Sequence, residues 1–207
     1  MYSVGVFASG GGSNFKAIAD KVSEHGLDIE FKFLLTNNSK CGAIDKAEAL
    51  TVPTHHVSTK THPNESERDQ AILSIVKESK IDLLILAGYM KKIPDAVLAL
   101  LPNKIINIHP ALLPSFGGKG HYGMNVHTAV LEYGAKVSGA TVHFVNEEYD
   151  CGKIIKQGVV DIANDETPES LAQKVLAVEH EIYWQVVAAF SKKQIEIIDE
   201  KVHYFGK

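Results

Sequence analysis

The chain has 207 residues, of which 45% are hydrophobic and 22% charged, and its net charge is −4. This composition excludes a disordered protein and favours one α/β domain over residues 1–207. The negative charge argues against a nucleic-acid binder, because phosphates require a basic surface. Cys41 and Cys151 lack metal-ligand spacing, and no leader or membrane-length apolar run is apparent. We therefore expect a cytoplasmic monomer or homodimer with small-molecule partners and no membrane partner.

The first predicted elements are a strand, a glycine turn and a helix. Residues 2–8 are mostly apolar and lead into Ser-Gly-Gly-Gly-Ser-Asn at 9–14. Glycines let backbone amides approach an anion, and a helix start adds positive partial charge. The turn therefore predicts a phosphate site at Gly12, Ser13 and Asn14, with a turn capped by Ser13 or Asn14 as an equal alternative. A nicotinamide site is disfavoured, because the third glycine of the dinucleotide fingerprint is missing.

Strands and helices then alternate as far as residue 109. Strands are expected at 29–35, 52–57, 81–87 and 105–109, and helices at 41–50 and 65–77. The run 81–87 is nearly all apolar, as in a central parallel strand covered on both faces. This alternation predicts an α/β, Rossmann-like fold: a mostly parallel twisted sheet with helices on both faces.

The loop after residue 87 is a second candidate site. Its residues 88–94 read Gly-Tyr-Met-Lys-Lys-Ile-Pro, at the sheet edge where residue 109 is also expected. Met90 and Ile93 could hold an aromatic ring while Lys91 or Lys92 meets a carboxylate. On these residues alone an ordinary loop, with a proline opening the next helix, is the favoured interpretation.

The strand at 105–109 carries two residues suited to catalysis. Side chains alternate along a strand, so Asn107 and His109 are expected to point to the same face. Pro110 cannot continue the ladder, which places His109 at the carboxyl end of the strand, where open parallel sheets bind ligands. A carboxamide beside an imidazole suits polarising a carbonyl and moving a proton.

The second half opens with a glycine-rich segment at 111–123, expected to be a mobile active-site loop because long loops in compact domains are usually functional. Further elements follow in the order of a helix at 124–133, strands at 137–145 and 154–155, a helix from Thr167, and a hairpin of 195–198 and 202–205. Asp150 precedes Cys151-Gly152, where a lone aspartate is usually only a turn residue. Glu179 lies on or beside the inward face of the last helix, where a carboxylate more often keeps its tip in water than contacts a substrate ammonium.

Taken together, these segments resemble the phosphoribosylglycinamide formyltransferase family. The matching motifs occur in the family's order at residues 9–14, 87–90, 107–114, 142–145 and 150–152. The resemblance extends from Ser3 to about Phe190. It implies transfer of the formyl group of 10-formyltetrahydrofolate to the amine of phosphoribosylglycinamide in purine biosynthesis. It also implies direct attack by the amine, with folate as co-substrate and no requirement for a metal.

The resemblance assigns roles to three groups of residues. Catalysis would fall to Asn107, His109 and Asp150, with the aspartate raising the pKa of the histidine. The ribotide would be bound by Gly11, Gly12, Ser13, Asn14, Leu176 and Glu179. The folate would lie against Tyr89, Met90, Lys91, Lys92, Ile93, Asn107, Asn146, Glu147, Glu148, Tyr149 and Asp150. Cys151 is assigned a structural role.

Several positions depart from the family pattern. Lys91 stands where an arginine is common in the family. Many members also carry an arginine before the third helix, and Arg68, the only arginine of this chain, is the only candidate for that role. The loop at 117–123 is longer than usual, and Leu176 replaces a polar residue. A formyltetrahydrofolate deformylase, a methionyl-tRNA formyltransferase and a non-catalytic folate-binding module remain alternatives. The tRNA enzyme is disfavoured, because it would need basic charge and a further domain.

Overall fold

The first half of the chain forms a parallel sheet. The protein is described by a computed structural model over residues 1–205 and divides into two compact units, Met1–Asn107 and Ile108–Lys207. The strands of the parallel sheet are β1 Tyr2–Phe7, β2 Ile29–Thr36, β3 Thr54–His56, β4 Leu83–Leu86 and β5 Ile105–His109. They lie in the order β3-β2-β1-β4-β5, and each neighbouring pair is parallel. The single domain expected over the whole chain stays a prediction.

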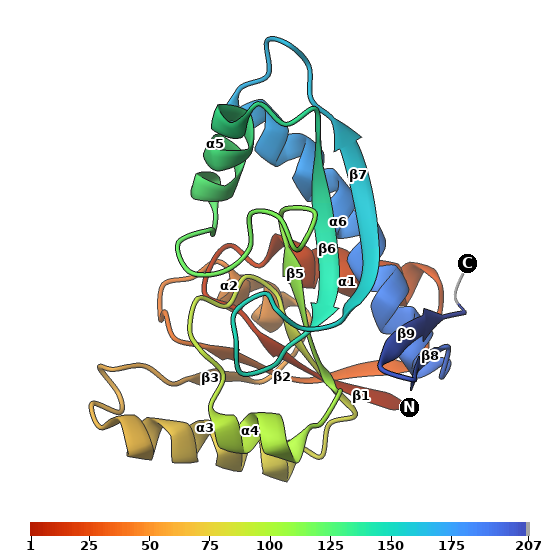
Figure 1. Ribbon diagram of the computed structural model, residues 1–207. Coiled ribbons are helices and arrows are strands. Elements are labelled where there is room, and N and C mark those ends of the chain that lie inside the picture. Colours follow the sequence, from red (N-terminus) through yellow and green to blue (C-terminus); the bar gives the residue numbers. More distant parts are fainter. Residues whose placement is uncertain (206–207) are drawn as a thin grey trace. The chain divides into compact units, whose positions relative to one another are not determined.

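Helices cover both faces of this sheet. Helices α1 (Ser13–Glu24) and α2 (Ala43–Ala49) lie on one face, and α3 (Glu65–Ser79) and α4 (Asp95–Leu100) lie together on the other (Figure 1). Crossovers between parallel strands are right-handed. The chain steps outward from β1 to β3 and then returns past β1 to β4, so the later helices take the opposite face. The predicted α/β class is confirmed for this unit.

The order of the strands reverses between β1 and β4, and ligands bind beyond the carboxyl ends of strands at such a point. Both strands are buried there, from Val4 to Phe7 and over all of β4. Backbone hydrogen bonds connect the two following loops, because Ser9 N donates to Gly88 O at 3.0 Å and Ala87 N donates to Phe7 O at 2.8 Å. The glycine turn and the 88–94 loop therefore start side by side.

The second unit contains an antiparallel pair of strands, β6 Val137–Phe144 and β7 Ile154–Asp161. The long helix α6 (Pro168–Ser191) packs on both strands and on α5 (Met124–Tyr133), and the hairpin of β8 (Ile195–Ile198) and β9 (Lys201–Tyr204) follows it. Thr167 begins α6 with a capping box, in which its side chain accepts from Ser170 N and the Ser170 hydroxyl accepts from Thr167 N. The predicted start of this helix is confirmed.

The strands β3 and β7 differ from the prediction in length. Only three residues of the expected 52–57 run are in β3, which begins directly after Pro53. Strand β7 extends to Asp161, far beyond the predicted 154–155, and its side chains alternate between more buried and more exposed positions. Polar residues such as Lys156 interrupt its apolar run, so the apolar pattern alone gave too short a strand.

Candidate active site

The glycine turn in the first unit joins β1 to α1. Gly12 is the N-cap residue of α1 and has a φ of 71°, in the left-handed region that favours glycine. A Cβ at Gly12 would lie 2.8 Å from the Cα atom of Ala43 on α2, so the turn packs closely against that helix. The N-cap of α1 is Gly12, without a side-chain hydrogen bond, and not Ser13 or Asn14, which lie in the first turn of the helix. Lys46 brings positive charge to the turn, because its Nζ donates to Gly11 O at 2.6 Å.

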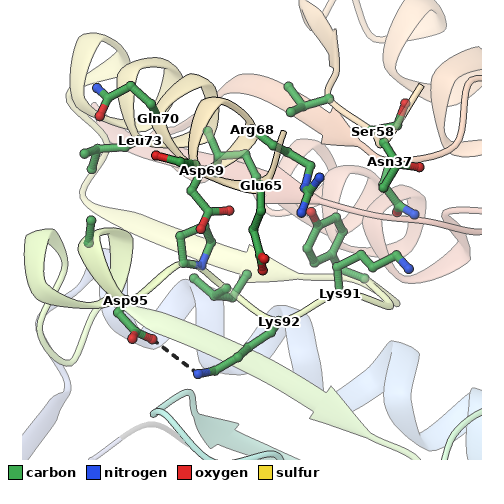
Figure 2. A pocket seen from close by; sticks show the side chains of 18 residues that line it. Asn37, Ser58, Glu65, Arg68, Asp69, Gln70, Leu73, Lys91, Lys92 and Asp95 are labelled. Carbon is green, nitrogen blue, oxygen red and sulfur yellow. Dashed lines mark hydrogen bonds and ion pairs between the residues drawn. The ribbon is translucent and has the colours of Figure 1, made fainter. Parts of the chain in front are cut away.

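The 88–94 loop borders a cavity of about 900 Å³ within the first unit (Figure 2). Of the residues predicted to bind folate, this cavity is lined by Tyr89, Lys91, Lys92 and Ile93. Met90 is not among its lining residues and is 52% exposed, so the aromatic-holding role expected of it has no support from this cavity.

Three cationic side chains line this cavity together with acids. Figure 2 shows Arg68 reaching from α3 toward the segment that carries Lys91 and Lys92. A hydrogen bond from Nη1 of Arg68 to His62 O, at 3.2 Å, holds the guanidinium in place. Lys92 forms an ion pair with Asp95 at 3.3 Å. The arrangement can accept a carboxylate, and it places Arg68 beside the lysines at a position that the sequence left open.

In the second unit, Asp150 lies between two imidazole rings. His109 Nδ1 is 3.5 Å from Asp150 Oδ2, and His143 Nε2 is 3.6 Å from Asp150 Oδ1. Both histidines are buried, with His109 4% and His143 2% exposed. The predicted approach of Asp150 to His109 is confirmed, whereas His143 is a contact that the sequence analysis did not identify.

The loop that follows β5 contacts both members of the His109–Asp150 pair. His109 Nε2 lies 2.8 Å from Phe116 O, and Gly118 N donates to Asp150 Oδ2 at 2.9 Å. Phe116 and Asp150 both have positive φ angles, 55° and 57°, which cost non-glycine residues roughly 1–2 kcal/mol each. Strained backbone of this kind is concentrated at functional sites.

The start of this loop is fixed by Thr141 on β6. Its buried hydroxyl donates to Ala111 O at 2.7 Å and accepts from Leu113 N at 3.0 Å. The hydroxyl also accepts from the side-chain amide of Gln157 on β7 at 3.0 Å. Hydrogen bonds therefore attach the start of the loop to strands β6 and β7, before the chain reaches Phe116.

Burial and charge act in opposite directions on the histidine and the acid. Burial lowers the pKa of His109 below its ordinary value, and this outweighs Asp150 and the Phe116 carbonyl, which raise it. Asp150 raises the His109 pKa as predicted, but the net shift is downward. For Asp150, burial is the largest single influence and raises the pKa. His143, His109 and the Gly118 amide together outweigh it, so the net pKa of Asp150 is lowered.

The remaining predicted residues are divided between the two units. Asn107 lies in β5 two positions before His109, at the end of the first unit, which also holds Gly11, Gly12, Ser13 and Asn14. Leu176 and Glu179 lie on α6 in the second unit. Glu179 is only 8% exposed, so the expectation that its tip lies in water is wrong. The residues from Asn146 to Tyr149 form an exposed turn before Asp150.

Within residues 1–205, no group of three or more His, Cys, Asp or Glu residues is arranged to hold a metal ion. None of the helices in the same range combines the length and apolarity needed to cross a membrane.

Comparison with known proteins identifies the family. The formyl transferase family matches residues 3–187. The phosphoribosylglycinamide formyltransferase of Bacillus subtilis is 37% identical over 187 residues, which are 90% of this chain and 93% of that protein. The chain belongs to the formyl transferase family.

Other relatives and solved structures agree with this assignment. The chloroplastic phosphoribosylglycinamide formyltransferase of Arabidopsis thaliana is 43% identical over 192 residues, which are 92% of this chain but 66% of that protein. The chain thus spans about two thirds of the length of this plant relative and 61% of the one from Vigna unguiculata. Glycinamide ribonucleotide transformylase 1 from Symbiobacterium toebii superimposes with a TM-score of 0.90 at 32% identity, covering 99% of this chain and 94% of that one.

A formyltetrahydrofolate deformylase from Pseudomonas syringae has a TM-score of 0.88, covering 99% of this chain and 66% of that one, but its identity is 24%. This likeness shows a shared fold only. The predicted α/β fold is confirmed by these structures.

Proposed function

We propose that the chain transfers the formyl group of 10-formyltetrahydrofolate to the amine of N1-(5-phospho-D-ribosyl)glycinamide. The observation that carries this proposal is the buried His109–Asp150 pair, at 3.5 Å, in a chain of the formyl transferase family. The reaction belongs to purine biosynthesis and uses the folate as co-substrate, with no metal required. A cytoplasmic location stays a prediction.

The chemistry begins with attack of the neutral amine on the formyl carbon. A C–N bond forms, the carbonyl electron pair moves to oxygen, and the later loss of N10 of the folate restores the carbonyl. One proton leaves the attacking nitrogen and one is gained by N10, so the transfer is balanced. Asn107 and His109 are the proposed donors to the oxygen, each contributing typically ~10²–10³-fold in rate.

His109 is suited to this role as a neutral imidazole, because burial lowers its pKa. A carbonyl oxygen only accepts, so the 2.8 Å contact with Phe116 O assigns the N–H of neutral His109 to Nε2. The formyl oxygen must replace the Phe116 carbonyl at this N–H. We therefore expect the segment around Phe116 to move when substrates bind, while Asp150 stays at Nδ1 and receives a proton through water.

The substrates are assigned to the sequence motifs already described. The ribotide phosphate would lie on the amides of Gly12, Ser13 and Asn14, where the start of α1 favours an anion, and Glu179 would meet the glycinamide amine. The folate would use the 88–94 loop, and its carboxylates would pair with Arg68, Lys91 and Lys92 in the cavity of the first unit. This assignment gives the lone arginine a specific function.

One experiment separates the transferase from its alternatives. The protein is mixed with 10-formyltetrahydrofolate, with and without the ribotide, and folate absorbance is followed. Loss of formyl only with ribotide supports the transferase, and loss without ribotide indicates a deformylase that uses water. Tight folate binding with no loss in either mixture indicates a non-catalytic folate-binding module and contradicts the proposal.

A further inference from the structure

Each oxygen of the Asp150 carboxylate faces a different histidine. Oδ2 lies 3.5 Å from His109 Nδ1 and also accepts from Gly118 N at 2.9 Å, whereas Oδ1 lies 3.6 Å from His143 Nε2. His143 is on β6, is almost wholly buried, and has no part in the mechanism proposed above. Because His143 is buried beside the Asp150 carboxylate, the position of its ring hydrogen affects the charge of the site.

The contacts with backbone carbonyls indicate which ring nitrogens of the two histidines carry a hydrogen. His143 Nδ1 lies 2.8 Å from Phe144 O, and a carbonyl has no hydrogen to give, so Nδ1 must carry the N–H. A neutral His143 would then direct the lone pair of Nε2 at the Asp150 carboxylate. His109 meets the same condition, because its Nε2 faces Phe116 O and its Nδ1 faces Asp150.

Two neutral rings would therefore direct two lone pairs at one carboxylate, which is electrostatically unfavourable in a buried site. One additional proton on His109, His143 or Asp150 removes this repulsion for at least one of the two rings. Burial opposes placing it on His109, whose pKa is lowered. The contact with His143 is the largest of the interactions that lower the pKa of Asp150. The proton is therefore placed between His143 Nε2 and Asp150 Oδ1, which lie 3.6 Å apart.

We propose that His143 is a positioning residue of the catalytic centre, carrying a proton on Nε2 toward Asp150 Oδ1 and so holding the carboxylate with Oδ2 toward His109. This inference rests on the proposed function for its catalytic consequence, although the proton on His143 does not depend on it. Held in this way, the carboxylate stays beside His109 Nδ1, while Nε2–H of His109 stays directed away from Asp150 and available for the substrate. The other titratable groups close to the pair are His121, in the loop after β5, His127, on α5, and Cys151, next to Asp150.

The proton can be observed directly by ¹⁵N NMR of the histidine rings in the intact protein, without any substrate. The Nε2 resonance of His143 is expected to lie away from the position of a bare ring nitrogen at neutral pH. It should move toward that position in Asp150→Asn, which lacks the acid. A bare-nitrogen resonance in the wild type, unchanged by Asp150→Asn, would overturn the proposal.

Kinetics test the positioning role. His143→Phe fills the space without an N–H and is expected to lower kcat about tenfold, the size of one hydrogen bond to a charged group. It should also shift the pH limb that reports His109. His143→Gln keeps an N–H for Asp150 and should recover part of the rate, which a purely space-filling role does not predict.

His180→Gln is the matched control, because His180 is half-buried in the same unit but contacts neither oxygen of Asp150. It is expected to keep the wild-type pH profile. Circular dichroism verifies that each variant is folded, and the NMR measurement decides the question if His143→Phe is not. Wild-type kcat and pH profile in folded His143→Phe would refute the positioning role. Absence of formyl transfer by the wild type would instead refute the proposed function.

Discussion

At the scale of single residues, the site is governed by competition between burial and charge at His109. Burial disfavours the imidazolium, Asp150 favours it, and the net pKa is lowered. Nε2 of His109 is directed at the Phe116 carbonyl and away from Asp150, so it is the donor whether or not Nδ1 carries a proton. Mutation of His109 removes the proposed donor, whereas mutation of Asp150 changes the charge beside it, so the two mutations should have different effects.

Replacing His109 with alanine is expected to lower kcat by roughly 10²–10³-fold, because one of the two proposed oxyanion donors is lost. The measurement is steady-state formyl transfer followed by folate absorbance. A thermal unfolding experiment serves as the control for folding, since the imidazole is buried. Near-normal turnover would remove this histidine from the mechanism.

Asp150→Asn should move the pH limb that reports His109 to lower pH. The carboxylate raises the pKa of His109, so its removal leaves burial opposed only by the Phe116 carbonyl and lowers that pKa further. The rate should also fall by about tenfold or more, because the carboxylate that is proposed to receive the proton of the amine is lost. The pH dependence of kcat/KM for both proteins is the test, and an unchanged limb would contradict the pairing.

At the scale of elements, the glycine turn shows how packing and ligand binding share one constraint. Gly12 must adopt a left-handed φ and must also lie against Ala43. Both conditions bring the start of α1 close to α2, where Lys46 contacts Gly11 O. A side chain at Gly12 would therefore disturb the fold and the phosphate site together.

Gly12→Ala is expected to destabilise the protein by at least about 1–2 kcal/mol, the cost of the left-handed conformation for a residue with a Cβ. The 2.8 Å approach to backbone atoms of Ala43 adds to this cost and should raise KM for the ribotide. Gly10→Ala is the matched control, because a Cβ there has no neighbour within 4 Å. Urea unfolding and ribotide titrations measure both effects, and equal behaviour of the two variants would refute the argument.

The sequence predicted the elements better than their contacts. Apolar periodicity located nearly every strand, and Pro110 correctly marked the end of β5 after His109. The contact of His143 with Asp150 was missed, because it depends on how the turn after β6 folds back, which alternation along one strand does not encode. For Glu179 the sequence left a water-exposed tip and a substrate contact as alternatives, and it could not predict the 8% exposure, since burial of a stripe-edge residue depends on what packs against the helix.

At the scale of the whole molecule, several buried histidines couple stability to pH. Burial is the main cause of the lowered pKa of His109, His127 and His180, which have ordinary values of 6.5. Because the folded pKa is depressed, the unfolded chain binds more protons as pH falls through 6.5. Stability is therefore fully present above this value and is lost progressively as pH falls toward the folded pKa values. The stability that comes from the lowered pKa of Asp150 is present above its ordinary value of 3.8 and is lost only as the pH falls below that value.

The free energy of unfolding in urea should accordingly be smaller at pH 5.5 than at pH 7.5, with no contribution from Asp150 in this interval. His127→Leu tests the origin of the effect, because it removes one of the three histidines with a lowered pKa and does not contact Asp150. The difference between the two pH values should shrink in this variant. His203→Leu, at an exposed position on β9, should leave the difference unchanged. A pH difference that is the same in wild type and His127→Leu would show that the acid sensitivity arises elsewhere than in this buried histidine.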